Sequence, residues 1–203
     1  MWGWIAAIAS LASVLAGGGA DPVQPAPPSV RRFWTSDAHA YASPWYTGRH
    51  RVMIGFGCTP APYYDPAPGC PHSEGFHHGI DVALPCGAWL FSAVDGVVAP
   101  ARGPGAPGPA YGPRAFRIRV STGSTTGTGS TSGAGPTTGV DVLLGHVRVA
   151  YVHPGDRVHR GDLVARADRL GAPDGCHLHL EVRPAGGGYA SAVDPASYLG
   201  LLR

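Results

Sequence analysis

The 203-residue sequence contains no lysine and no asparagine, and charged residues make up only 14% of it. Its formal net charge is only +2, so we expect no nucleic-acid partner, because such binding usually requires a clustered basic face. Glycine and proline, 31 and 21 residues, form about a quarter of the chain and exclude a long-helix bundle or a coiled coil. The chain has neither the H-E-x-x-H motif of helical zinc proteases nor the C-x-x-C pair of zinc–thiolate sites. Its length fits one domain, or one domain with a tail.

The N-terminal segment, residues 1–20, is uncharged and largely apolar. Its apolar run ends in small residues, and Gly18 and Ala20 suit cleavage by signal peptidase, which predicts an extracytoplasmic protein, secreted or associated with the cell wall. An uncleaved anchor is the alternative, because about 20 apolar residues can span a bilayer, and only then would the protein contact a membrane. Residues 21–40 are proline-rich and predict an extended linker, so the domain is expected at 41–203.

The remaining apolar runs are short, rich in β-branched and aromatic residues, and separated by turn residues. This pattern predicts an all-β fold, an antiparallel β-sheet or sandwich-like domain with long loops. The expected strands cover residues 51–56, 80–84, 89–98, 115–120, 140–147, 163–167 and 177–182. Two segments predict loops: 103–113, rich in Gly and Pro, and 121–139, almost wholly Ser, Thr and Gly.

Polar and apolar residues alternate in the segment His177-Leu178-His179-Leu180-Glu181. On a strand, this alternation points both histidines and Glu181 to one face, while the leucines enter the core. A solvated polar face is the alternative interpretation. Histidine is a poor choice for solubility alone, so two imidazoles side by side favour a functional site.

Two further histidine patterns precede this segment. His77 and Asp81 have an H-x-x-x-D spacing; the Gly79 between them argues against a helix, so Asp81 is expected on a strand and His77 on the loop that enters it. The neighbouring His78 is an alternative ligand. Farther along, an apolar strand ends in His146. Each pattern alone is weak evidence, and the significance lies in their combination.

Taken together, these motifs resemble those of the lysostaphin-type (LytM-like) zinc endopeptidases, which cut peptide bonds in bacterial peptidoglycan. The resemblance covers about residues 52–183 and depends on the order and rough spacing of the three histidine motifs. It implies a metalloendopeptidase that holds one zinc ion per chain and acts on peptidoglycan peptides, in a stem peptide or a cross-bridge. The zinc ligands that it implies are His77, Asp81 and His179, and the catalytic pair is His146 and His177.

The chemistry of these residues agrees with that division of roles. Two neutral imidazoles and one carboxylate leave a fourth tetrahedral position for water, as catalytic zinc sites require. The two other histidines can take a proton from the water and return one to the leaving amine. Glu181 lies on the histidine face by strand parity, where it could orient a ligand or pair with Arg183, and the sequence leaves both interpretations open.

The four cysteines fit an oxidising compartment and allow three pairings. Two ligands of one metal indicate that the strands with Asp81 and His179 are antiparallel neighbours. Cys86 lies five residues after Asp81 and Cys176 three before His179, so the two cysteines come within a register step or two of facing each other. We therefore predict disulfide bonds Cys86–Cys176 and Cys58–Cys70.

Two other classes of protein match parts of the sequence. A non-catalytic module of the same fold, which binds cell wall or activates a hydrolase, typically lacks one or more ligands, whereas all five positions are filled here. A lipoyl-like carrier would fit the turn at Pro154-Gly155-Asp156, but it needs a lysine, and the chain has none.

The long loop at 121–139 replaces a short turn of the family, and we expect it to border the cleft because it leads into the strand that ends at His146. The scissile bond and the oligomeric state are not indicated by the sequence.

Overall fold

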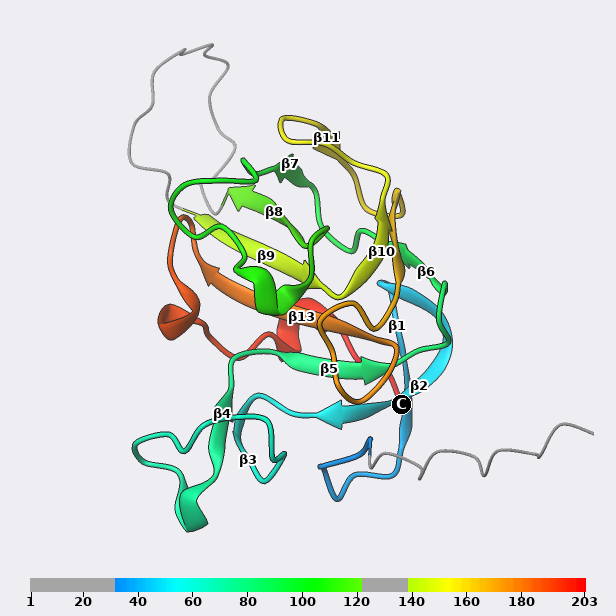
Figure 1. Ribbon diagram of the computed structural model, residues 1–203. Coiled ribbons are helices and arrows are strands. Elements are labelled where there is room, and N and C mark those ends of the chain that lie inside the picture. The colour runs from blue at the N-terminus through cyan, green and yellow to red at the C-terminus, as the bar shows by residue number, and fades with distance from the viewer. Residues whose placement is uncertain (1–31, 122–138) are drawn as a thin grey trace, which may run out of the picture.

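The computed structural model describes residues 32–121 and 139–203. Within these ranges the chain is almost entirely β-structure, and antiparallel pairing joins its strands, as the sequence predicts (Figure 1). The strands are β1 (Ala40–Ser43), β2 (Tyr46–Ile54), β3 (Gly57–Thr59), β4 (Gly75–His77), β5 (Ile80–Ala83), β6 (Trp89–Phe91), β7 (Gly96–Val98), β8 (Phe116–Ser121), β9 (Gly139–Gly145), β10 (Val147–Ala150), β11 (Arg157–Val158), β12 (Leu163–Ala167) and β13 (His177–Pro184). Three 3₁₀ turns (Pro71–Ser73, Pro109–Tyr111, Tyr189–Ser191) and the helix α1 (Ala196–Leu199) complete the described elements.

Eleven of these strands form one curled sheet in the order β10-β12-β6-β2-β5-β13-β9-β8-β7-β11, with β1 attached to β2. The strands β3 and β4 pair with each other in a separate hairpin below β5 in Figure 1. The central strand β13 lies between β5 and β9, so its residues are flanked on both sides by backbone ladders. This position makes β13 the rigid centre of the molecule.

The main hydrophobic core contains the leucines of β13, which accounts for the apolar positions of the alternating pattern. Leu178 and Leu180 of β13 are fully buried and belong to one cluster with Ile118 of β8 and Leu144 of β9. Burial of each such side chain stabilises the fold by about 1.5–3 kcal/mol. The opposite face of β13 is also buried, so the polar side chains on it require hydrogen-bond partners.

Three local details differ from the sequence-based expectation. The strand expected at 89–98 is two strands, because the Ser92 side chain bonds the backbone of Val94 and turns the chain between β6 and β7. The strand expected at 140–147 is interrupted at His146, whose φ of 53° cannot continue a strand. His77, expected in a loop, is the last residue of β4, because it pairs with Gly57 of β3.

Part of the segment expected as a linker contacts the domain. Phe33 and Trp34, expected in the linker, pack against Met53 and Ile54, and the backbone N–H of Trp34 donates a 2.8 Å hydrogen bond to the carbonyl of Met53. The segment at 1–20 lies outside the described residues, as does 122–138 of the loop. Within the described ranges, no helix has the length and hydrophobicity of a membrane span.

Candidate active site

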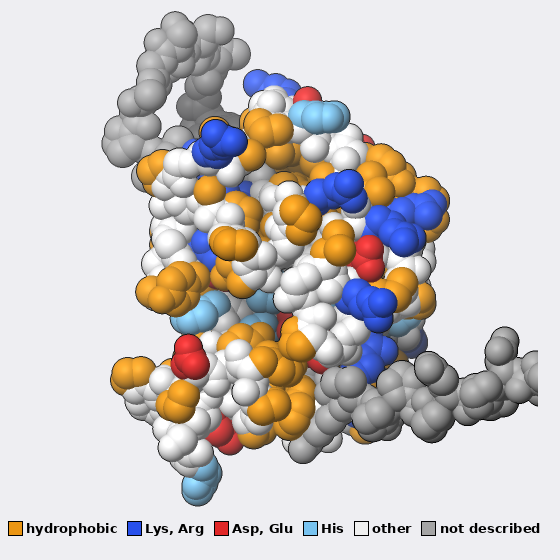
Figure 2. Space-filling model, in the orientation of Figure 1, with side chains coloured by type: hydrophobic (Ala, Val, Ile, Leu, Met, Phe, Trp, Pro, Cys, Tyr) orange, Lys and Arg blue, Asp and Glu red, His pale blue; other side chains and the backbone are white. Residues whose placement is uncertain are grey.

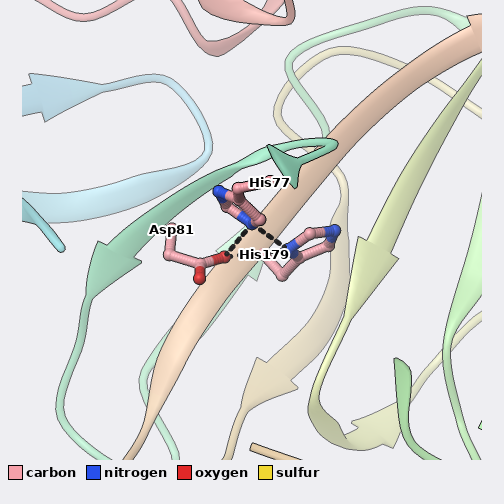
Figure 3. Close-up of side chains that lie close together, drawn as sticks. All are labelled: His77, Asp81 and His179. Atoms are coloured by element: carbon pink, nitrogen blue, oxygen red, sulfur yellow. Dashed lines mark hydrogen bonds and ion pairs between the residues drawn. The ribbon is translucent and has the colours of Figure 1, made fainter. Parts of the chain in front are cut away.

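Three potential metal ligands meet at the centre of the sheet. His77 ends β4, Asp81 lies in β5 and His179 in β13, and all three side chains are buried (Figure 3). The Nε2 of His77 lies 3.2 Å from the Nδ1 of His179 and 3.4 Å from the Oδ1 of Asp81, and the last two atoms are 2.8 Å apart. The predicted set is therefore brought together from three separate elements.

The geometry and chemistry of this set fit a zinc ion. Zinc–ligand bonds of about 2.0–2.1 Å in a tetrahedron place neighbouring ligand atoms about 3.3 Å apart, close to the observed separations. The Nδ1–H of His77 donates to the carbonyl of Gly55 at 2.9 Å, which leaves the Nε2 lone pair for a metal. The second ring nitrogen of His179 faces Glu181, which leaves its Nδ1 for the same purpose.

Close packing around His179 explains the glycine between the two ligands of the H-x-x-x-D motif. A Cβ atom at Gly79 would lie 2.7 Å from the Cε1 of His179 and 2.7 Å from the carbonyl oxygen of Leu180. Both distances are shorter than van der Waals contact. Only glycine lets the turn between β4 and β5 lie against β13, and this turn sets the separation of His77 and Asp81.

Asp81 and His179 shift each other's pKa values. Burial alone would raise the pKa of Asp81, but the adjacent His77, His177 and His179 hold this pKa well below its usual value. Burial likewise opposes protonation of His179, yet the hydrogen bond and charge of Asp81 raise the pKa of His179 to about 9. Asp81 is thus a carboxylate at neutral pH, as a metal ligand must be.

The two remaining histidines of the motifs lie beside the ligands. His146 follows β9 and His177 begins β13, and their ring centroids are 4.7 Å apart. The Nδ1–H of His146 donates to the carbonyl of Leu170 at 2.8 Å, and that of His177 donates to the carbonyl of Gly175 at 2.9 Å. Each ring therefore keeps its Nε2 unprotonated in the neutral state.

The environment of these two nitrogens suits proton transfer. The Nε2 of His177 is buried, has no hydrogen-bond partner among the described residues, and lies 3.6 Å from the Oδ1 of Asp81. Burial, followed by the nearby His177 and His179, lowers the pKa of His146 to about 4. The ring of His146 is therefore a neutral base next to the ligand set.

Glu181 contacts both of the partners that the sequence left open, the candidate ligand His179 and the neighbouring Arg183. Its Oε2 lies 3.4 Å from the Nε2 of His179, and its Oε1 accepts a 2.5 Å hydrogen bond from the Nε of Arg183. Arg183 in turn donates to the hydroxyl of Tyr111 at 2.7 Å. The buried side chains of Glu181 and Arg183 thus support the ring of His179 and connect it to the partly buried Tyr111 in the turn at Pro109–Tyr111.

All five motif residues open onto one cleft of about 1250 Å³. Figure 2 shows it as a hollow across the face of the molecule, with histidine side chains inside. Its walls come from loops around Tyr63, Tyr111, Asp174 and Tyr189. The sequence motifs do not identify these residues, because they lie in loops outside the motifs. Their aromatic or acidic side chains are the only feature of the sequence that could have indicated a place in the site.

Both predicted disulfide bonds are present. Cys58 and Cys70 are joined with a Cα separation of 5.4 Å, and Cys86 and Cys176 with one of 5.1 Å. The second bond connects the end of β5 to the residue before His177. It therefore braces the strand that carries two of the five site residues against the strand that carries Asp81.

The loop expected at 121–139 has its two ends away from the cleft. Ser121 pairs with Gly139 where β8 ends and β9 begins, whereas His146 follows the opposite end of β9. Neither Ser121 nor Gly139 lines the cleft. The reason for expecting this loop to border the cleft is therefore wrong, since the strand direction separates its anchors from His146.

Comparison with known proteins identifies the family. The sequence model of Peptidase family M23 matches residues 75–195, more than half of the chain. The structure is similar to that of LytU, at 25% identity and a TM-score of 0.50, over 75% of this chain and 86% of that one. It is also similar in fold to the antimicrobial peptidase lysostaphin from Staphylococcus simulans, at 16% identity and a TM-score of 0.53, over 81% of this chain and 55% of that one. No curated protein matches the sequence significantly. The chain therefore belongs to peptidase family M23.

Proposed function

We propose that this peptidase is a secreted zinc metalloendopeptidase that hydrolyses peptide bonds in bacterial peptidoglycan, in a stem peptide or a cross-bridge. The observation that carries the proposal is the position of the His177 Nε2, which is buried, has no hydrogen-bond partner in the described part of the chain, and lies 3.6 Å from the carboxylate of a three-residue ligand set. His77, Asp81 and His179 would hold the zinc ion. The bound ion would lower the pKa of a water molecule to about 7 and polarise the scissile carbonyl.

The residues around the ligands account for the proton transfers of hydrolysis. The Nε2 of His177 accepts a proton from the attacking water, and His146, whose ring centroid lies 4.7 Å from that of His177, supplies a second base. Once protonated, either ring stabilises the oxyanion and then gives its proton to the nitrogen of the leaving amine. The backbone acceptors at Leu170 and Gly175 hold both rings in the orientation that these steps need.

Two features support action outside the cytoplasm. The uncharged segment at 1–20 is typical of a signal peptide or an anchor. Both pairs of cysteines form disulfide bonds in the structure, and such bonds persist in oxidising compartments. Peptidoglycan is the substrate implied by the resemblance of the motifs, and it is exposed in that compartment.

The test is mass spectrometry of fragments released from purified peptidoglycan by the zinc-loaded protein. We expect fragments with a new amino terminus and a new carboxyl terminus, and no such fragments from the His177→Ala variant. A properly folded, zinc-loaded wild-type protein that binds peptidoglycan of several bridge types without releasing peptides would overturn the proposal. That result would assign the chain to the non-catalytic modules of the same fold.

A further inference from the structure

The loop before β13 carries a buried carboxylate that none of the roles assigned above uses. The residue Asp174 is only 3% exposed. Its Oδ1 lies 3.6 Å from the Nδ1 of His177, and its Oδ2 accepts a 2.7 Å hydrogen bond from the hydroxyl of Tyr63. Because an isolated buried carboxylate is destabilising, its position behind a catalytic ring calls for a functional explanation.

Donors from two distant parts of the chain hold this loop in place. The Nε of Arg32 donates a 2.9 Å hydrogen bond to the backbone carbonyl of Asp174, and one terminal nitrogen of Arg32 donates a 2.7 Å bond to the carbonyl of Cys176. The side chain of Cys176 is itself fixed by its disulfide bond to Cys86. Both Arg32 and Tyr63 precede the region that the family match covers. Contacts from outside that region therefore position the residues just before His177.

Two oxygen atoms, one from Gly175 and one from Asp174, lie near the Nδ1 of His177. The carbonyl of Gly175 accepts the Nδ1–H at 2.9 Å, and the Oδ1 of Asp174 lies 3.6 Å from the same nitrogen, beyond hydrogen-bond distance but close enough for electrostatic attraction. An accepting carbonyl and a nearby carboxyl oxygen at one edge of the ring favour the proton on Nδ1 and leave the Nε2 lone pair directed at the cleft. Burial and the hydrogen bond to Asp174 raise the pKa of Tyr63, so its hydroxyl stays protonated and keeps donating to the carboxylate.

We propose that Asp174, held by Tyr63 and Arg32, is a positioning residue that fixes the ring orientation and tautomer of His177. This inference rests on the proposed function, because it requires that His177 transfers protons during peptide hydrolysis. It adds a residue that acts at the Nδ1 edge of the ring, opposite the Nε2 that transfers the proton. Tyr63 donates its hydroxyl hydrogen bond to Asp174, the Oδ1 of Asp174 lies 3.6 Å from the Nδ1 of His177, and all three residues line the cleft.

The decisive variant is Asp174→Asn in the full-length zinc-loaded protein. With its amide oxygen accepting from Tyr63, the asparagine would turn its NH₂ group towards the His177 Nδ1 and replace an acceptor by a donor. We expect kcat on a soluble muropeptide to fall by at least about 10-fold, with little change in KM. The loss should not exceed the about 10²–10⁴-fold that acid–base catalysis contributes. Long-range ¹H–¹⁵N spectra should show that His177 loses its single Nδ1–H tautomer. Tyr63→Phe, which removes one hydrogen bond and no charge, should lower kcat less.

A matched control exists on the surface. Asp156 lies 3.6 Å from the Nδ1 of His153, with the same three-residue spacing and the same distance as the pair at the site, but both residues are exposed. We expect Asp156→Asn to leave kcat, zinc content and melting temperature unchanged. This comparison separates a general effect of removing an acidic charge beside a histidine from the effect at the site.

The outcomes distinguish this inference from the proposed function. Full kcat in His177→Ala would overturn the proposed function, and the positioning role with it. Loss of kcat in His177→Ala together with full kcat in Asp174→Asn would overturn the positioning role alone. If Asp174→Asn instead loses zinc or melting temperature in parallel with kcat, while the His177 tautomer is unchanged, Asp174 is a structural residue and the inference is wrong.

Discussion

Asp81 and His179 face each other directly across the ladder between β5 and β13, and the Nδ1 of His179 lies 2.8 Å from the Oδ1 of Asp81. Two ligands of the candidate zinc site are thus fixed by backbone pairing, and the third, His77, is brought in by the short turn at Gly79. A site fixed in this way needs little rearrangement to bind a metal ion. It follows that loss of one ligand removes affinity without disturbing the other two.

We predict that Asp81→Ala strongly reduces bound zinc, because two imidazoles alone neither neutralise the ion nor complete the three-ligand set. Metal analysis after purification in the presence of zinc measures the effect. Asp156→Ala, which removes an exposed carboxylate from a surface turn, is the control and should keep one zinc per chain. Full zinc occupancy in Asp81→Ala would show that the ion binds elsewhere.

We predict that His146→Ala and His177→Ala keep their zinc and lose about 10²–10⁴-fold in turnover, because each removes a base that holds no metal. Metal analysis and peptide release are measured on the same samples. His153→Ala, in an exposed turn, should behave as wild type. Near-normal turnover of either site variant would contradict the catalytic role of that residue.

The parts of the site that follow strand periodicity were predictable from sequence. Alternation in His177-Leu178-His179 fixes which side chains share a face, and the register with β5 then brings Cys86 within two residues of the position opposite Cys176. These relationships depend only on the period of two along a strand and on antiparallel pairing. They require no knowledge of loop conformation.

The loop-derived parts were not predictable in the same way. Asp174 and Tyr63 are separated by 111 residues, and no local pattern indicates that their side chains meet. The positive φ of His146, which ends a strand that its apolar neighbours favour, also depends on tertiary contacts: its backbone N–H donates to the carbonyl of Tyr111, and its ring to Leu170. Long-range hydrogen bonds of this kind override local propensity.

We predict that the two disulfide bonds make unequal contributions to stability. Cys86–Cys176 spans 90 residues and Cys58–Cys70 only 12, and the entropy model gives about 4–5 kcal/mol for loops of the longer kind against about 3 kcal/mol for short ones. Cys86 is exposed, so mild reductant can reach the longer bridge. We expect its reduction to weaken zinc binding before the domain unfolds, because Cys176 directly precedes His177.

The measurement follows zinc release and near-ultraviolet circular dichroism during titration with reductant, with peptide mapping to identify the bond that opens. The variant Cys58→Ser/Cys70→Ser isolates the longer bridge and should retain the zinc response. Simultaneous loss of zinc and tertiary structure in that variant would contradict a local effect on the site.

We predict that residues 122–138 can be replaced by a two-residue turn without loss of folding. Ser121 and Gly139 are directly paired at the ends of β8 and β9, so a tight hairpin connection fits between them. Because these anchors lie away from His146, turnover of a soluble peptide should be preserved. Thermal unfolding and turnover of the shortened protein provide the test, and global unfolding would assign a structural role to this segment.

The last prediction concerns acid stability and a buried ion cluster outside the cleft. Asp141 of β9 is fully buried and accepts hydrogen bonds from Arg117 at 2.8 Å, from Arg119 at 2.8 and 3.0 Å, and from the backbone N–H of Gly186 at 3.0 Å. Burial alone would raise the pKa of Asp141, but the hydrogen bonds and charges of these partners lower it below its ordinary value. Arg117 is also buried, so removal of the carboxylate would leave its charge uncompensated.

The sign of the pH dependence follows from the lowered pKa. The folded state binds the proton on Asp141 less readily than the unfolded state, so this contribution to stability is complete above about pH 4 and is lost as the pH falls towards the folded-state pKa. In Asp141→Asn we expect a loss of about 3–5 kcal/mol at neutral pH, because one partner of a buried ion cluster is removed. As the pH falls below about 4, the difference in unfolding free energy between wild type and variant should shrink, because protonation removes the same charge from the wild type. Urea unfolding of both proteins across this range measures that difference, and a difference independent of pH would show that the charge of Asp141 does not stabilise the fold.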